Sequence, residues 1–219
     1  MALLPRLRLL LSFGRGVLRG LPAADEGKDP IALFGEWFGS AEEAGLYLPE
    51  AMALSTATPD GFPSSRMVLL KSFDERGFAF FTNHGSRKAA ELDENPRAAL
   101  LFHWNVLQRQ VRVEGTVGRI PLEESAAYFA SRGRGSQLGA WASRQSAPLP
   151  GRGELEERMA EVKRRFQGKE VPLPPFWGGY RLVPRAMEFW QGRADRLHDR
   201  LRFTREGQAG PWEVTRLYP

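Results

Sequence analysis

The spacing of apolar positions first indicates a helix. Between residues 31 and 38, apolar side chains are separated by three and four positions, which places them along one face of an α-helix. Asp29 can accept hydrogen bonds from the first free N–H groups of that helix. Pro30 suits the first helical position because it has no N–H to leave unpaired. The sequence therefore predicts that the first ordered element begins at Asp29 and Pro30.

From residue 52 to residue 117 the pattern shortens to a period of two, which is typical of strands. Val111 and Val113 alternate with Arg112, as in a strand with one buried face. Turn-forming residues at 59–61 and 74–77 separate neighbouring runs. The predicted strands are Met52–Thr58, Arg66–Lys71, Phe78–Thr82, Arg97–Trp104 and Gln108–Val117. Short strands joined by tight turns favour an antiparallel barrel or sandwich over a parallel sheet.

Further helices interrupt and follow these strands. The predicted helices are Ala89–Glu94, Leu122–Ser131, a segment around Gln137–Ser143, and Glu154–Gln167. The tail, residues 178–216, returns to strands, with Met187–Trp190 and Arg200–Thr204 as candidates. The mixture makes the fold class mainly β with α (α+β). Because no internal repeat or low-complexity linker is evident, we expect residues 29–219 to form a single domain. Residues 1–28 would form an N-terminal arm, either flexible or amphipathic, or a targeting segment.

Composition excludes several classes of site. The chain has 219 residues, of which 42% are hydrophobic and 26% charged, as in an ordinary globular protein. It has no cysteine and only three histidines, which excludes a disulfide framework, a cysteine nucleophile and most zinc sites. Phosphate-binding loops of the G-x-x-x-x-G-K-[ST] type and the common hydrolase motifs are missing. We expect no metal, and no stretch approaches the roughly 18 apolar residues of a membrane span.

The net charge of +5 is unevenly distributed. Residues 1–24 contain four arginines and no acid, so that residues 25–219 hold 27 basic and 26 acidic side chains. A nearly neutral globular part argues against a general nucleic-acid surface. Arginine outnumbers lysine 26 to 5, and its rigid, forked guanidinium suits phosphate and carboxylate groups.

Two groups of cations are candidates for binding anions. Ser86, Arg87 and Lys88 open a predicted helix, whose free N–H groups and positive dipole end would attract a phosphate. The alternative is a surface helix with solvated charges. Arg66 and Lys71 bracket an apolar strand, and a period of two would place them on opposite faces.

A third candidate lies near residue 132. Tyr128, Arg132 and Ser136 are spaced by four, so that an uninterrupted helix would place two hydroxyls and a guanidinium on one face, a set that fits a phosphate monoester. Glycines at 133 and 135 argue against an uninterrupted helix, in which case Ser136 would contribute from a loop.

The fourth candidate is near the C-terminus. In a strand, Arg196, His198 and Arg200 would point to one side, which is costly unless that side faces an anionic ligand. The alternative is an exposed strand whose cations pair with Asp195 and Asp199.

Together these segments resemble the pyridoxine (pyridoxamine) 5′-phosphate oxidase family. The similarity runs from about Asp29 to Pro219. It rests on separated blocks in family order: Arg66–Lys71, Phe81–Asn83, Gly85–Lys88, Arg109–Val111, Ser131–Arg132, Ser136–Ala140, Arg144–Ser146, Phe176–Gly179, Glu188–Gly192 and Arg196–Arg200. The resemblance implies an FMN-binding split β-barrel with flanking helices. It also implies a homodimer with FMN at the interface, each site being built by both subunits.

The resemblance also implies roles for individual residues. The residues implied to bind FMN are Arg66, Met67, Val68, Leu69, Leu70, Lys71, Phe81, Thr82, Arg87, Lys88, Gln110, Gln145, Ser146, Trp190 and Arg200. The phosphate of the substrate would contact Lys71, Tyr128, Arg132 and Ser136. Arg196, Leu197 and His198 would contact its ring, with Arg196 and His198 as catalytic residues.

The implied reaction is oxidation at C4′ of pyridoxamine or pyridoxine 5′-phosphate to pyridoxal 5′-phosphate. A hydride would pass to the flavin, and O2 would reoxidise it to give H2O2. We expect no nucleic-acid or membrane partner and a cytoplasmic location. Alternatives are a related flavin oxidoreductase similar to phenazine-pathway oxidases, and a non-catalytic protein that binds FMN or pyridoxal phosphate.

The sequence departs from the family pattern at two places. Family members carry an Arg-x-x-Tyr type of segment ahead of the Asp-Pro helix, and the corresponding stretch here, Leu11–Gly20, has no tyrosine. Gly133 stands where a proline often follows Ser131 and Arg132, which removes a restraint on φ.

Overall fold

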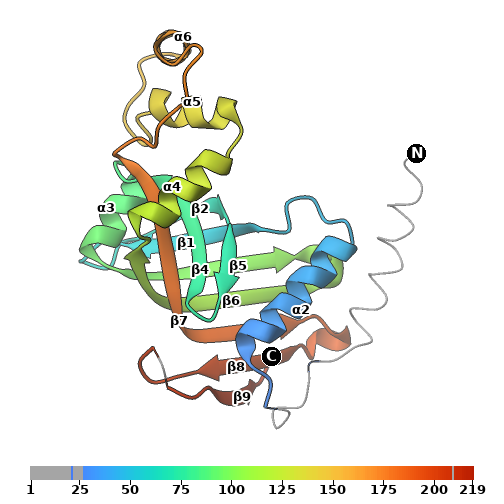
Figure 1. Ribbon diagram of the computed structural model, residues 1–219. Helices are drawn as coiled ribbons and strands as arrows, with labels where there is room; N and C mark the ends of the chain where they lie inside the picture. The colour runs from blue at the N-terminus through green and yellow to red at the C-terminus, as the bar shows by residue number, and fades with distance from the viewer. Residues whose placement is uncertain (1–20, 22–26, 209) are drawn as a thin grey trace, which may run out of the picture.

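A curled antiparallel sheet with five flanking helices forms the described part of the chain (Figure 1). The computed structural model describes residue 21, residues 27–208 and residues 210–219. The N-terminal stretch without tyrosine, Leu11–Gly20, therefore lies outside the described residues, as does most of the predicted arm. The strands are β1 (Ala51–Ala57), β2 (Pro63–Leu69), β3 (Ser72–Asp74), β4 (Gly77–Asn83), β5 (Arg97–Trp104), β6 (Arg109–Arg119), β7 (Trp177–Gln191), β8 (Asp199–Thr204) and β9 (Glu213–Leu217). The predicted antiparallel barrel, within an α+β fold, is confirmed.

The helices confirm the predicted ones to within a few residues. They are α2 (Pro30–Glu43), α3 (Arg87–Glu94), α4 (Leu122–Ser131), α5 (Arg134–Ala142) and α6 (Arg152–Arg165). Helix α2 begins where the sequence predicted, because the Asp29 side chain accepts hydrogen bonds from the N–H groups of Ile31 (2.8 Å) and Ala32 (3.0 Å). None of the helices in the described residues is long and apolar enough to cross a membrane.

Strand β7 joins the two parts of the sheet. The main order is β2-β1-β5-β6-β7-β4-β3, and β8 also pairs with β7 and carries β9. The first residues of β7 pair with β4 and the last with β8. Within the tail predicted to return to strands, the sequence singled out only Met187–Trp190 of β7, because most of its fifteen residues are buried and show no alternation. Strand β3 was not predicted, and β9 lies in the tail that was predicted to return to strands, although it was not singled out.

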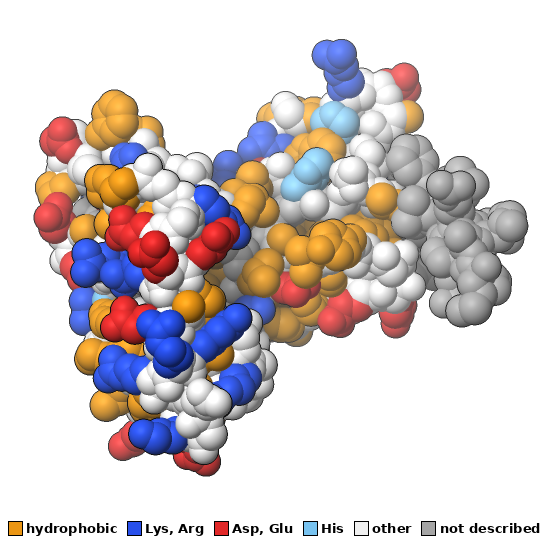
Figure 2. All heavy atoms as spheres, turned by 90° about the horizontal axis from the view of Figure 1, so that it is seen from above, with side chains coloured by type: hydrophobic (Ala, Val, Ile, Leu, Met, Phe, Trp, Pro, Cys, Tyr) orange, Lys and Arg blue, Asp and Glu red, His pale blue; other side chains and the backbone are white. Residues whose placement is uncertain are grey.

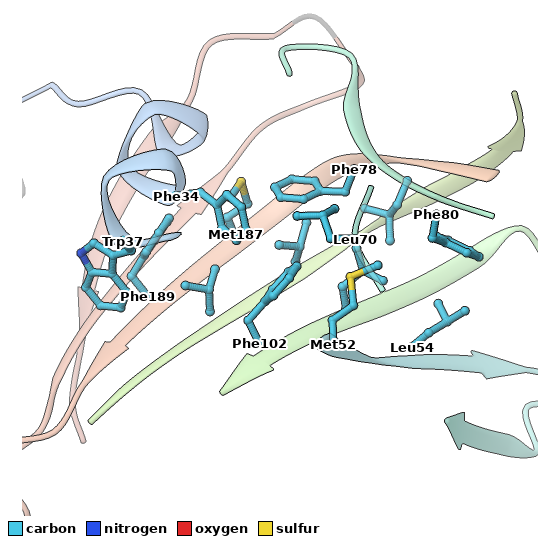
Figure 3. Packing of buried hydrophobic residues seen from close by; sticks show 14 of the residues in the cluster. Phe34, Trp37, Met52, Leu54, Leu70, Phe78, Phe80, Phe102, Met187 and Phe189 are labelled. Atoms are coloured by element: carbon cyan, nitrogen blue, oxygen red, sulfur yellow. The ribbon is translucent and has the colours of Figure 1, made fainter. Parts of the chain in front are cut away.

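Aromatic side chains fill the core between α2 and the concave side of the sheet (Figure 3). The Phe34 ring is fully buried, and its centroid lies 4.8–4.9 Å from those of Phe73, Phe78 and Phe102, each in an edge-on arrangement. Such pairs contribute about 0.5–1.5 kcal/mol each beyond the area that they bury. This packing fixes the strands from which the candidate site is built.

A smaller cluster holds α4, α5 and α6 at one end of the sheet (Figure 1). Phe129 from α4, Leu138 from α5 and Trp177 at the start of β7 pack there. Strands β8 and β9 lie at the opposite end of the molecule (Figure 1). The two ends therefore present different sets of side chains.

Candidate functional site

A cavity of about 1040 Å³ lies where β2, β4, α3 and the α4–α5 connection meet. Seen from above, the surface is hollowed between two lobes, with lysine and arginine side chains at its edges (Figure 2). Predicted site residues that line this cavity are Arg66, Met67, Val68, Leu69, Lys71, Phe81, Thr82, Arg87, Lys88, Tyr128, Arg132, Ser136, Gln145 and Ser146. Five of the lining residues are cationic, and within the described chain no Asp or Glu lines it. The cavity therefore suits an anionic ligand.

The start of α3 forms one cationic region of the cavity. Lys88 is only 8% exposed, and its Nζ donates to Thr82 Oγ1 (3.2 Å) and Gln145 Oε1 (3.3 Å). Burial and the neighbouring charge of Arg66 lower the pKa of Lys88. Ser86 occupies the N-cap position, but its hydroxyl makes no capping hydrogen bond. The helix start thus keeps free backbone donors beside two cations.

Lys71 and Arg66 both line the cavity, although a regular strand would place them on opposite faces. Strand β2 ends at Leu69, and the period of two no longer applies to Lys71. Leu70 is 4% exposed and packs in the core, and it is not among the described residues that line the cavity. The two-residue connection between β2 and β3 therefore buries Leu70 and brings Lys71 to the cavity wall.

The second cationic region is formed by Tyr128, Arg132 and Ser136. They do not share one helix, because α4 ends at Ser131 and Arg132 is extended (φ −74°, ψ 145°) before α5 begins. All three nevertheless line the cavity. The glycine at 133 thus marks a break between helices, as its helix-breaking character indicated.

Arg132 has an incomplete set of partners. Its Nη1 atom is buried and has no hydrogen-bond partner among the described residues. Its guanidinium carbon lies 4.8 Å from the centroid of the Trp177 ring, and burial lowers the pKa of the guanidinium. A buried donor without an acceptor is costly, and an anion in the cavity would satisfy it.

A stack of aromatic rings supports this region. The Phe81 ring lies 4.1 Å from that of Tyr128 and 5.5 Å from that of Trp177, both nearly parallel. Gly179 permits this arrangement, because a Cβ atom there would lie 2.7 Å from the Phe81 ring and 2.7 Å from Ile120. The Trp-Gly-Gly segment of β7 therefore sets the position of the Tyr128 ring.

Six predicted residues lie elsewhere in the chain. Gln110, Trp190, Arg196, Leu197, His198 and Arg200 do not line the cavity within this single described chain. Cross-strand pairing places Gln110 opposite Trp190 and Trp190 opposite Arg200. These residues form a second group near β8, at the other end of the sheet from α4 and α5 (Figure 1).

The prediction that Arg196, His198 and Arg200 alternate along one strand is wrong. Residues 194–196 form a short 3-10 turn in which Asp195 and Arg196 have positive φ angles of 56° and 61°, and β8 begins only at Asp199. The His198 ring instead lies 4.5 Å from that of Trp190. Non-glycine residues in this conformation are strained and often occur at functional sites.

Ion pairs account for part of this second group. Asp199 pairs with Arg193 and Arg216, both at 3.4 Å, and Arg200 Nε donates to the buried Glu188 at 2.9 Å. The alternative, in which the cations of this group pair with Asp195 and Asp199, is therefore not borne out for Arg200, which pairs with Glu188, and Asp199 pairs with arginines outside the group. Arg196 and Leu197 remain exposed.

The sequence reasoning missed Glu91, which lies behind the cationic wall. It accepts hydrogen bonds from Arg87 Nε (2.8 Å) and Arg66 Nη2 (3.0 Å). The spacing of four between Arg87 and Glu91 was a usable signal, because such residues meet on one face of a helix. Arg66 lies on strand β2, far from Glu91 in the sequence, so its contact with Glu91 could not be predicted from residue spacing.

Comparisons with known proteins agree with the observed fold and show the family of the chain. Residues 40–166 match the sequence model of pyridoxamine 5′-phosphate oxidase, and residues 177–219 match that of the pyridoxine 5′-phosphate oxidase C-terminal dimerisation region. A pyridoxine/pyridoxamine 5′-phosphate oxidase of Rubrobacter xylanophilus is 63% identical over 200 residues, 91% of each chain. The protein of that name from Psychromonas ingrahamii is 55% identical over the full length of both.

Solved structures extend the comparison. PhzG from Burkholderia lata, in complex with tetrahydrophenazine-1-carboxylic acid, is 36% identical with a TM-score of 0.86, covering 93% of this chain and 100% of that one. A pyridoxamine 5′-phosphate oxidase-related, FMN-binding protein from Nostoc punctiforme is 17% identical with a TM-score of 0.69, covering 88% and 99%, and shares the fold. By its sequence matches over most of its length, the chain belongs to the pyridoxamine 5′-phosphate oxidase family.

Proposed function

We propose that the protein is an FMN-dependent oxidase that converts pyridoxamine 5′-phosphate or pyridoxine 5′-phosphate to pyridoxal 5′-phosphate. The observation that carries the proposal is the cavity with five cationic side chains, among them Arg132 with its buried, unpartnered Nη1. Both the cofactor and the substrate are phosphate monoesters, so two cationic regions in one cavity fit the pair. The relatives bearing the oxidase name support the same reaction.

The first region would hold the phosphate of FMN. Arg66, Arg87 and Lys88 supply positive charge, and Thr82 supplies a hydroxyl. The free N–H groups at the start of α3 add donors. Met67, Val68 and Leu69 of β2 would lie along the flavin, and Gln145 and Ser146 would complete this side of the pocket.

The second region would hold the phosphate of the substrate. Lys71 and Arg132 supply charge, and Tyr128 and Ser136 supply hydroxyls. The aromatic stack of Phe81, Tyr128 and Trp177 keeps the Tyr128 ring fixed, so that little side-chain entropy is lost on binding. This region anchors the substrate at the end remote from C4′.

The second group of residues would reach the cavity from the partner subunit of a homodimer. The dimerisation region of the family covers residues 177–219, which include Trp190, Arg196, Leu197, His198 and Arg200. An apolar side chain is exposed both at the cavity, where Met67 is 66% exposed, and in the second group, where Leu197 is 69% exposed. Each would be covered if the two protomers paired through these surfaces.

Arg196 would orient the ring of the substrate, and His198 would contact its substituents. The backbone N–H of Arg193 donates to His198 Nδ1 (3.2 Å), so the proton of the neutral imidazole lies on Nε2. His198 can thus donate one hydrogen bond from Nε2 to the substrate. Bound FMN supplies the hydride acceptor, with O2 as the final oxidant. The residues of the chain align the substrate and exclude water.

Two measurements test the proposal. Purified protein is expected to be yellow or to take up added FMN, and to release H2O2 with pyridoxamine 5′-phosphate. A protein that binds FMN but turns nothing over would instead be a non-catalytic binder. At a pyridoxamine 5′-phosphate concentration well below KM, where Arg132→Met and Arg196→Met each retain little activity, dimers reassembled from equal amounts of the two should show about a quarter of the wild-type activity, because half of them then contain one intact site. No restored activity would refute a site shared between subunits.

A second candidate substrate class comes from the similarity to PhzG, whose bound molecule is tetrahydrophenazine-1-carboxylic acid. A substrate without phosphate would not use Lys71, Tyr128, Arg132 and Ser136 together. Turnover of partly reduced carboxylic acids of this kind, without turnover of pyridoxamine 5′-phosphate or pyridoxine 5′-phosphate, would favour this class. The cytoplasmic location stays a prediction.

A further inference from the structure

The cationic wall of the cavity has one carboxylate behind it. Glu91 lies on α3, is 4% exposed and does not line the cavity, yet it contacts two of the cations that do. Its Oε1 accepts from Arg87 Nε at 2.8 Å, and its Oε2 accepts from Arg66 Nη2 at 3.0 Å. Glu91 therefore connects an arginine of the helix with an arginine of strand β2.

Two hydroxyl groups complete this network. Thr56 and Ser64 each accept a hydrogen bond from Arg66 and donate one to Glu91 Oε2. Arg66 also donates to the carbonyl oxygen of Leu54 (3.2 Å). The guanidinium of Arg66 is thus held by strands β1 and β2 and by Glu91, which leaves it a single orientation. Arg87 uses only its Nε for Glu91, and both of its terminal nitrogens stay available to a ligand within the described part of the chain.

The network keeps Glu91 charged despite its burial. Burial would raise the pKa of the carboxyl group, but hydrogen bonds from Ser64, Thr56, Arg87 and Arg66 outweigh it and lower the pKa to about 2. The three cations Arg66, Arg87 and Lys88 together with this one anion carry a net charge of +2. A phosphate monoester carries about −1.5 to −2 at neutral pH, so the charges match.

We propose that Glu91 is a positioning residue that orients Arg66 and Arg87 for a phosphate monoester and sets the charge of that region. The inference rests on the proposed function, since it assumes that FMN occupies the first region. A residue that only stabilised the fold would affect the binding of the whole flavin. In the proposed role, Glu91 affects only the binding of the flavin's phosphate.

The test compares the affinities of the purified apoprotein for FMN and for riboflavin, which lacks the phosphate. The ratio of the two dissociation constants, measured by quenching of flavin fluorescence, isolates the contribution of the phosphate. Glu91→Gln is expected to weaken FMN binding about 10-fold or more, because Arg66 and Arg87 lose the charged acceptor that orients them. Riboflavin affinity should stay unchanged. Glu94→Gln, an exposed acid on the same helix, is the matched control and should leave both constants unchanged.

Two results would contradict the proposed role of Glu91. If Glu91 only reduced the positive charge, Glu91→Gln would tighten FMN binding; if it were only structural, both flavins would bind more weakly. Either result overturns the proposal. Should Glu91→Gln not fold, Thr56→Val removes one bridging hydroxyl with little change in volume, and a smaller loss in the same ratio is expected. A wild-type protein that binds no FMN would refute the proposed function, whereas an unchanged ratio in the variants would refute only the role of Glu91.

Discussion

Replacing Arg132 by methionine should have opposite effects on stability and on substrate binding. The unpaired, buried Nη1 costs the free protein about 1–3 kcal/mol. The contact of the guanidinium with the Trp177 ring at 4.8 Å returns about 0.5–2 kcal/mol, and a methionine would keep part of that contact. The difference favours the variant by about 1 kcal/mol. For a chain of 219 residues this corresponds to a rise in Tm of about 2–4 °C.

The same change should weaken the oxidase. Losing a charge-assisted hydrogen bond to the substrate phosphate costs about 1.5–3 kcal/mol, or roughly 10- to 150-fold in kcat/KM. Because the phosphate is remote from C4′, most of the loss should appear in KM. Thermal melts of the apoprotein and H2O2 release against pyridoxamine 5′-phosphate concentration measure the two effects.

A neighbouring arginine provides the control. Arg134 donates to the carbonyl oxygens of Lys169 (2.9 Å) and Phe166 (2.6 Å), so its hydrogen bonds are made within the chain. Arg134→Met should lower the Tm and leave KM unchanged. The reasoning about Arg132 is refuted if Arg132→Met lowers the Tm and leaves KM at its wild-type value.

Three further changes test other parts of the structure. Gly133→Pro should raise stability by about 0.4–1 kcal/mol, because Gly133 has φ −56° and open space at its Cβ; a lower Tm would contradict this. The pKa of Glu91, about 2 instead of 4.5, means that the charged form stabilises the folded state above pH 4.5 and that this contribution, about 3 kcal/mol, is lost as the pH falls towards 2. Urea unfolding of the apoprotein at several pH values should show this slope, and Glu91→Gln should flatten it. Gly179→Ala should displace Phe81 and weaken substrate binding without removing FMN, and wild-type kinetics would show that the close contact does not matter.

Local patterns predicted the elements better than their relations in space. Strand β5 and helix α4 were predicted to the residue, because alternation and helical spacing are local properties. The period of two was applied to Lys71 and His198 although neither lies in a strand, since β2 ends at Leu69 and β8 begins at Asp199. The positive φ angles of Asp195 and Arg196 interrupt the extended backbone, and no pattern of apolar residues in the sequence signals this interruption. Side-chain direction there depends on backbone turns, which the pattern does not encode.

The membership of the candidate site followed mainly from the resemblance to the family. Residues such as Gln145 and Ser146 carry no local signal of their own, yet they line the cavity. The residues around Arg196 could not be related to the cavity from one chain, because the proposed contact lies between subunits. Glu91 was not predicted as a site residue, because an acidic residue near arginines on a helix ordinarily forms a solvated ion pair.

The length of β7 has a consequence for the assembled dimer. Trp177 at its first residue lines the cavity of its own protomer, and Trp190 near its other end, roughly 45 Å away along an extended strand, would serve the cavity of the partner. One continuous segment would then contribute to two catalytic centres. A slip of a single residue in the register of β7 would turn both tryptophans to the other face of the sheet, so that one backbone error would disturb both centres together.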